Sequence, residues 1–61
     1  MRYSELKREL TRLGCIKRRE GKRHEIWFSP LTGKNFTVPR HDQEEVPAGT
    51  LKSIRKDAGS K

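Results

Sequence analysis

The sequence predicts an α+β fold, a two-layer sandwich in which a three-stranded antiparallel sheet carries two helices on one face. Apolar residues recur at helical spacing near both ends of the chain. Between these segments they alternate along short stretches that are bounded by turn residues. Each helix has a single apolar stripe, so both helices must bury their stripe against the same face of the sheet.

The first helix is expected at residues 4–13. Its apolar stripe has spacings of three and four residues and consists of Tyr3, Leu6, Leu10 and Leu13. Ser4 is a good N-cap residue, and Glu5 suits the positive end of the helix dipole. Gly14 can adopt the left-handed conformation that ends a helix. Cys15, which follows it, is expected to be a small buried apolar side chain.

Three strands are expected in the middle of the chain, at residues 15–20, 24–29 and 35–39. The turns that separate them are Gly21-Lys22-Arg23 and Pro30-Leu31-Thr32-Gly33. Pro39 closes the third strand because proline cannot donate a hydrogen bond to the ladder. Phe36 and Val38 share one face of this strand. Short turns between successive strands predict an antiparallel meander.

The two faces of the sheet are assigned from the alternation along the second strand. His24, Ile26 and Phe28 point to one side, and Glu25, Trp27 and Ser29 point to the other. The apolar pair predicts that the side of Ile26 and Phe28 faces the core. Trp27 is then expected outside this core, where it stacks an RNA base or packs against a partner protein or an edge of the fold.

The second helix is expected at residues 48–58. Its apolar stripe consists of Leu51, Ile54 and Ala58. Pro47 favours the helix start, Gly59 ends the helix, and Glu44 and Glu45 are expected to favour its dipole. The resulting order, α-β-β-β-α, matches the architecture of double-stranded-RNA-binding domains.

Size and charge narrow the classes of function. With 61 residues the chain is expected to form one small domain. Fifteen basic residues oppose eight acidic ones, and the net charge of +7 favours a nucleic-acid partner over a merely solvated basic surface. Cys15 is the only cysteine, so no intramolecular disulfide forms. Without a signal peptide or an apolar run of the ~20 residues that span a membrane, a cytoplasmic protein is expected.

Four motifs, in this order, resemble the HicA family of toxins from bacterial and archaeal toxin–antitoxin pairs. They are Leu13-Gly14, Gly21-Lys22-Arg23-His24, Val38-Pro39-Arg40-His41, and Gly49-Thr50-Leu51 with Ile54 and Ala58-Gly59. The resemblance covers nearly the whole chain and implies an mRNA interferase, a ribonuclease that cleaves mRNA. The family commonly has Gly-Ser-His or Gly-Gly-His at the turn, whereas here Lys22 and Arg23 precede His24.

The resemblance implies that His24 is the catalytic residue; by itself, a lone strand histidine is more often structural. Imidazole can take the proton of an RNA 2′-hydroxyl, which attacks the adjacent phosphorus and leaves a 2′,3′-cyclic phosphate and a 5′-hydroxyl. Lys22, Arg23 and Arg40 can stabilise the charge of the transition state. His41 is either an accessory catalytic residue, an RNA contact or a loop cap. No cofactor is needed, and two histidines without clustered carboxylates match no metal site.

The partners expected are an mRNA substrate and, through the resemblance, a HicB-type antitoxin. Lys52, Arg55 and Lys56 form a basic stripe on the second helix that either follows an RNA backbone or is a solvated face. The antitoxin is expected to present an acidic surface that covers His24, with the monomeric toxin inside a larger assembly. Two other functions stay open: a non-catalytic RNA-binding module of the same fold, and an interaction subunit that serves a partner protein.

Overall fold

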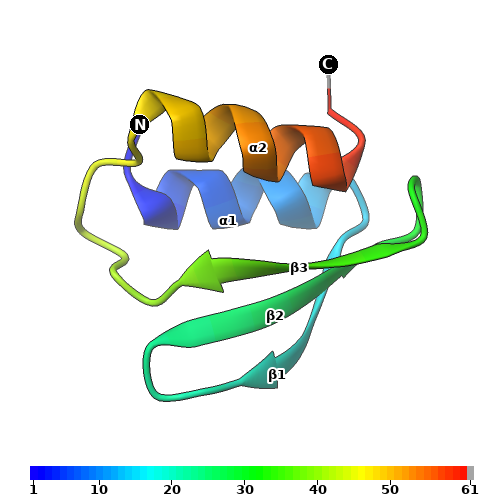
Figure 1. The fold of residues 1–61 in the computed structure, drawn as a ribbon, viewed down its shortest axis with the longest axis horizontal. Helices are drawn as coiled ribbons and strands as arrows, with labels where there is room; N and C mark the ends of the chain where they lie inside the picture. Colours follow the sequence, from blue (N-terminus) through cyan, green and yellow to red (C-terminus); the bar gives the residue numbers. More distant parts are fainter. Residues whose placement is uncertain (61) are drawn as a thin grey trace.

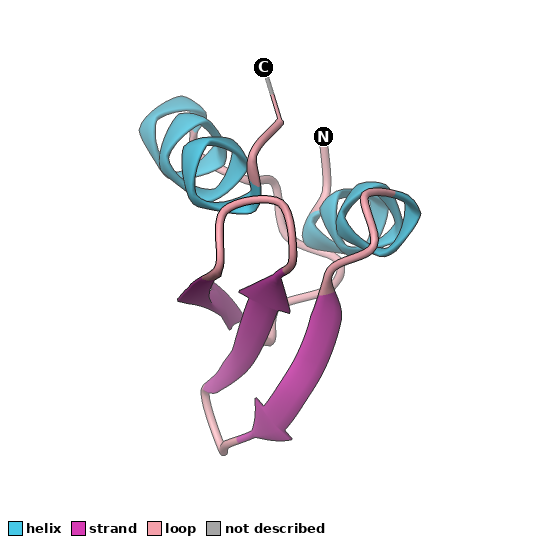
Figure 2. Ribbon diagram, turned by 90° about the vertical axis from the view of Figure 1, so that its right-hand side faces the viewer, coloured by secondary structure: helices cyan, strands magenta, loops and turns pink. Residues whose placement is uncertain are grey.

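The computed structural model describes residues 1–60 and confirms the predicted fold class. Its elements are α1 (Tyr3–Arg12), β1 (Ile16–Glu20), β2 (His24–Ser29), β3 (Lys34–Pro39) and α2 (Ala48–Ala58). Each bound lies within one residue of the expected one. The two helices lie side by side above the sheet (Figure 1). The view along the helices shows both on the same face, which leaves the other face of the sheet open (Figure 2).

The sheet is an antiparallel meander in the order β1-β2-β3, with β2 in the centre. Along β3 the pairing is regular and begins with His24 opposite Pro39. Along β1 the register shifts, because Lys17 lies opposite Trp27 while Arg19 lies opposite Ile26. Arg18, between these two positions, is therefore the extra residue of a β-bulge.

The face of β2 that packs against the helices is the reverse of the predicted one. Glu25, Trp27 and Ser29 are 5%, 6% and 0% exposed, while Ile26 and Phe28 are half-buried on the open face. This arrangement buries the large ring of Trp27, and its polar neighbours Glu25 and Ser29 are hydrogen-bonded inside the fold. The prediction that Trp27 contacts RNA or a partner protein is therefore wrong.

Burial of Glu25 is compensated by hydrogen bonds to donors within the core. The Trp27 indole Nε1 donates to Glu25 Oε1 at 3.0 Å, and Lys7 Nζ of α1 donates to Glu25 Oε2 at 3.1 Å. Ser29 Oγ likewise donates to the carbonyl of Ala58, in the last turn of α2, at 2.6 Å. Within residues 1–60 no buried side-chain polar atom lacks a hydrogen-bond partner, so the inverted face leaves no desolvated group unpaired.

The remaining core follows the predicted stripes. Tyr3, Leu6, Leu10, Cys15, Phe36, Val38, Val46, Ile54 and Ala58 are buried together with Trp27. Leu13 and Leu51 pack partly buried against this cluster. Gly14 and Gly59 both have φ of +89°, as expected for residues that end a helix in the left-handed conformation.

The start of α1 differs from the prediction, because Arg2 rather than Ser4 is the N-cap residue. Glu5 Oε1 accepts a hydrogen bond from the Arg2 backbone amide at 2.9 Å, which places this acidic side chain at the positive helix end as expected. Glu44 and Glu45 do not lie in the first turn of α2, where they were expected to favour the helix dipole. The Glu45 carboxylate pairs with the N-terminal amine at 2.9 Å, and Glu44 lies beside His41.

Replacing Ser29 with alanine should lower the free energy of unfolding by about 1–3 kcal/mol, because the buried carbonyl of Ala58 loses its donor. Urea denaturation of the two proteins measures the difference. Thr32→Val is the matched control, since Thr32 Oγ1 donates to the Asp57 carbonyl at an exposed position where water can replace it. An equal loss in both variants would contradict the role assigned to burial at Ser29.

Candidate functional site

His24 is the first residue of β2 and is exposed to solvent. The prediction that it faces the core is wrong, because the inner side of the strand is that of Glu25 and Trp27. His24 borders two hollows, one between β3 and α2 and the other on the open face of the sheet. The imidazole is therefore accessible to a substrate, which a buried structural histidine would not be.

The groove between β3 and α2 has a volume of about 610 Å³, comparable to clefts that take small ligands. Besides His24 its lining is mostly polar and includes Asn35, Thr37, Gly49, Thr50, Ser53 and Asp57. Gly49 and Thr50 belong to the first turn of α2, which no side chain caps. The third strand and the second helix thus bring the Gly49-Thr50 motif to the groove that His24 borders, a proximity that sequence spacing did not indicate.

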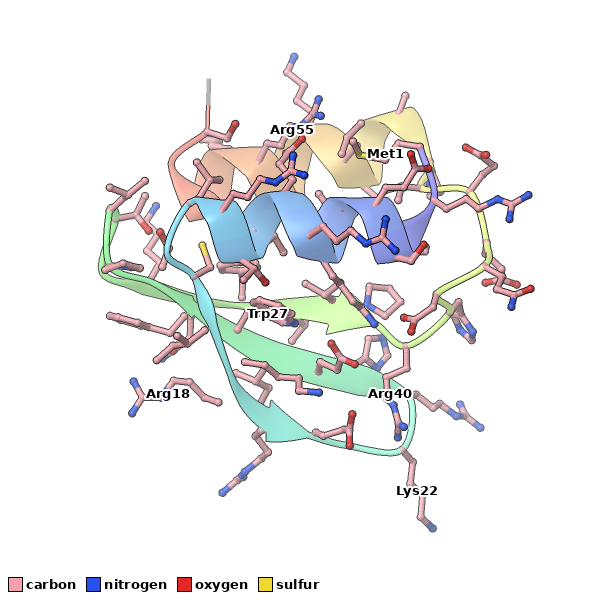
Figure 3. All side chains as sticks on the ribbon, turned by 180° about the vertical axis from the view of Figure 1, so that it is seen from behind. Met1, Arg18, Lys22, Trp27, Arg40 and Arg55 are labelled. Atoms are coloured by element: carbon pink, nitrogen blue, oxygen red, sulfur yellow. The ribbon has the colours of Figure 1, made fainter. Side chains whose placement is uncertain are left out.

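The hollow on the open face is the more basic of the two. Lys22, Arg23 and His24 border it together, as their adjacency in the sequence predicted, and Ile26 and Thr37 complete it. Arg19 borders it as well, and sequence reasoning did not single this residue out. Lys22 extends from the turn between β1 and β2 into solvent (Figure 3). Three basic residues therefore border the same hollow as the imidazole, a setting suited to a phosphate group.

Arg40 has a different position from the other predicted cations. Its Nη1 donates to the Gly21 carbonyl at 2.7 Å, and its backbone amide donates to the Arg23 carbonyl at 3.0 Å. The Gly21 amide in turn donates to the His24 carbonyl at 2.8 Å. Figure 3 shows Arg40 beside this turn. The Arg40 guanidinium thus fastens the turn that leads into His24. Its predicted contact with phosphate stays a prediction.

The carboxylate of Glu20 is a second partner of the Arg40 guanidinium. Its hydrogen bond from Lys17, and then the charge of Arg40, whose Nη2 lies 3.8 Å away, hold the pKa of Glu20 below its ordinary value. Glu20 is therefore ionised at neutral pH and available as a partner for Arg40.

Replacing Arg40 with glutamine should speed hydrogen exchange of the Gly21 amide about tenfold, because the turn loses a charge-assisted hydrogen bond. Exchange followed by NMR measures this local opening. Arg23→Gln removes the same charge from the same turn without a side-chain hydrogen bond in the structure. Faster exchange in both variants, or in neither, would show that Arg40 does not hold the turn.

His41 is exposed in the loop after β3, and its Nδ1 lies 3.5 Å from the Glu44 carboxylate. It borders neither of the two hollows at His24. Within residues 1–60 no hydrogen bond joins the two imidazoles. His41 and His24 therefore do not border a common hollow among these two.

Lys7 anchors this loop to α1. Its ammonium group pairs with both Asp42 and the buried Glu25. Burial lowers the pKa of Lys7, but the hydrogen bonds to Asp42 and Glu25 outweigh it and raise the pKa above its ordinary value. The same hydrogen bond lowers the pKa of Asp42. One cation therefore joins α1, β2 and the loop after β3.

The basic stripe on α2 is divided by the structure. Arg55 Nε and Nη2 both donate to the Glu9 carboxylate at 2.8 Å, so this guanidinium fastens α2 to α1 beside Met1 (Figure 3). Lys52 and Lys56 are exposed and have no ion-pair partner in the part of the chain that the structure describes. Of the predicted stripe, these two lysines are therefore the members whose charge is not paired within the described residues.

The Arg55–Glu9 pair makes stability depend on pH in a defined direction. The hydrogen bond from Arg55 lowers the pKa of Glu9 below its ordinary value of 4.5. Because the unfolded chain then binds the proton first, the stabilising contribution is complete above pH 4.5 and is lost as the pH falls through the lower folded value. Glu9→Gln should have a lower Tm than the wild type at pH 7 and a similar Tm near pH 3, measured by thermal unfolding. A constant difference at both pH values would contradict this.

In the described residues, no three His, Cys, Asp or Glu side chains gather in a way that could hold a metal ion. None of the described helices has the length and apolar character needed to cross a bilayer. 

The family model described as "HicA toxin of bacterial toxin-antitoxin" matches residues 3–60 of the chain. No curated protein and no solved structure matches it. The matched segment contains both helices, all three strands and the two hollows at His24.

Proposed function

The chain belongs to the HicA toxin family of bacterial toxin–antitoxin systems, and from this premise we propose that it is a metal-independent endoribonuclease that cleaves mRNA through His24. The observation that supports this proposal most strongly is the position of His24. It is the exposed imidazole at which a polar groove and a hollow bordered by three cations meet. A substrate that carries both a hydroxyl and a phosphate fits this combination of general base and positive charge.

In the proposed reaction, neutral His24 takes the proton of a ribose 2′-hydroxyl. The 2′-oxygen forms a bond to the adjacent phosphorus, and the bond from phosphorus to the 5′-oxygen breaks. Arg19, Lys22 and Arg23 stabilise the charge that develops on the phosphate oxygens. The leaving 5′-oxygen takes a proton from water, and His24 returns its proton to solvent. His41 receives no step, because it borders neither hollow.

The remaining cations have supporting roles in this proposal. Arg40 is a positioning residue, because it acts on the turn before His24 rather than on the RNA. Lys52 and Lys56 contact the RNA backbone along α2, beyond the groove.

Membership of the family implies an antitoxin partner, and we propose that it is of the HicB type and acts in the cytoplasm, where the mRNA is. The net charge of +7 favours an antitoxin with an acidic surface, because complementary fields speed and orient association. Such a partner would silence the toxin by covering His24.

The test is incubation of end-labelled RNA with the purified chain in excess chelator. The proposed activity yields fragments that carry a 2′,3′-cyclic phosphate and a 5′-hydroxyl. RNA that is bound but intact would instead support the non-catalytic RNA-binding module. Cleavage that stops on addition of chelator would contradict the metal-independent reaction.

A further inference from the structure

The open face of the sheet has an apolar centre with a basic surround. Ile26 and Phe28 are half-buried there, and Ile16, which lies opposite Phe28, is 56% exposed. The basic side chains on this face and its adjoining turn are Arg18, Arg19, Lys22 and Arg23. None of the four forms an ion pair with a carboxylate within residues 1–60. Their charge is therefore not neutralised within the described chain.

The acidic residues lie elsewhere in the molecule. The strands contain only Glu20 and Glu25, which are paired across β1 and β2 on the side of the helices. Glu25 is buried against Lys7, and Glu20 pairs with Lys17. The other six acidic residues belong to the helices and to the loop between β3 and α2. The open face thus presents positive charge without a competing carboxylate, which suits a polyanion.

The bulge in β1 makes this face more basic than a regular strand would. In unbroken alternation Arg18 and Arg19 would point to opposite sides of the sheet. At the bulge the Arg18 guanidinium lies over the Phe28 ring, 5.3 Å from its centroid, while Arg19 borders the hollow beside His24. Figure 3 shows Arg18 on the side of the sheet away from the helices. Both arginines are therefore on the open face.

We propose that the open face binds a single RNA strand, with the Arg18–Phe28 pair stacking one base and Arg19 contacting the phosphate on the way to His24. Phe28 and His24 are four residues apart on β2, or about 13 Å, a span of a few extended nucleotides. Guanidinium planes and aromatic rings are the surfaces on which unpaired bases stack. The proposal rests on the ribonuclease function for the role of His24, but binding to the face is measured separately.

A single strand fits this face better than a duplex, because only an unpaired base is free to stack on Phe28 and Arg18. An acidic protein is the rival occupant, since the exposed Ile16 would suit an apolar contact. RNA is favoured because Arg19 and Ile26 connect the Arg18–Phe28 pair with the basic hollow at His24.

Fluorescence anisotropy at several salt concentrations tests the proposal. The probes are a labelled 2′-O-methyl oligonucleotide of about twelve nucleotides, which has no free 2′-hydroxyl to attack, and the corresponding duplex. Arg18→Gln/Arg19→Gln is compared with Arg8→Gln/Arg12→Gln, which removes two charges from exposed positions of α1. The open-face variant should bind the single strand about tenfold more weakly and with a flatter salt dependence, and the α1 variant within about twofold of wild type.

Variants of Phe28 distinguish the contribution of base stacking from that of charge. Phe28→Leu keeps an apolar side chain but loses the ring, and should weaken binding about fivefold or more. Phe28→Tyr should restore wild-type affinity. Thermal unfolding of each variant verifies that the fold is retained.

Three results would overturn the proposal. Equal losses of single-strand affinity in the two double variants would show unspecific charge attraction. Wild-type affinity in all variants would show that RNA does not bind this face and would favour a protein partner there. Duplex binding as tight as single-strand binding would exclude stacking of an unpaired base. If the wild-type chain cuts RNA while the open-face variants bind the single strand with wild-type affinity, only this inference fails. If the wild-type chain leaves RNA intact while the open-face variants bind it more weakly, the ribonuclease proposal fails and the binding face remains.

Discussion

Replacement of His24 with alanine should lower the rate of RNA cleavage by about 10²–10⁴-fold, the usual contribution of a general base. The side chain is exposed at the start of β2, so its removal leaves the core intact. The loss should therefore appear in kcat, with little change in thermal stability. Steady-state cleavage of a labelled RNA, together with thermal unfolding of both proteins, measures the two effects.

His41→Ala is the matched control, since it removes the other imidazole from an exposed position outside both hollows. Its cleavage rate should stay within about threefold of wild type, because it has no step in the proposed reaction. A loss as large as that of His24→Ala would require an acid–base pair of the two histidines. A His24→Ala variant that still cleaves at the wild-type rate would remove His24 from the chemistry.

Replacement of Trp27 with alanine should lower the free energy of unfolding by about 3–5 kcal/mol, as expected for loss of a large core aromatic residue. The change also removes the indole donor from the buried Glu25 carboxylate. Small domains have only about 5–15 kcal/mol of stability, so the variant should be largely unfolded at moderate urea concentrations. Urea denaturation followed by circular dichroism measures the loss.

Phe28→Ala is the comparison that separates the two faces of β2. Phe28 is half-buried on the open face, so its truncation should cost less than about half as much as that of Trp27. The opposite order would mean that Ile26 and Phe28 face the core in solution, as alternation alone predicted.

The order of elements and their bounds were predictable because they depend on local signals. Apolar spacing defined the stripes of both helices, and Gly14 and Gly59 supplied the left-handed residues that end them. The inner face of β2 was not predictable from alternation, because Ile26 and Phe28 together suggested one face and Trp27 alone suggested the other. What decides it is distant in sequence: Lys7 of α1 compensates Glu25, and the end of α2 accepts the hydrogen bond of Ser29.

The site was predictable where its residues are neighbours in sequence. Lys22, Arg23 and His24 border one hollow because they form one turn and the first position of a strand. Arg19 joins them through an irregular register, and Arg40 reaches back to Gly21 across the sheet. Local periodicity does not predict where a bulge occurs or which group an exposed guanidinium contacts. The positions of Arg19 and Arg40 were therefore known only from the tertiary structure.

The central claim is that His24 activates the 2′-hydroxyl of RNA without a metal ion. The most direct measurement compares cleavage of one oligonucleotide in two forms, as RNA and fully 2′-O-methylated, by the wild-type chain in excess chelator. The RNA should be cut to fragments with 2′,3′-cyclic phosphate ends, while the methylated form is bound but stays intact, because it has no proton to give to His24. Cleavage of the methylated form, or an RNA that is never cut, would contradict the claim.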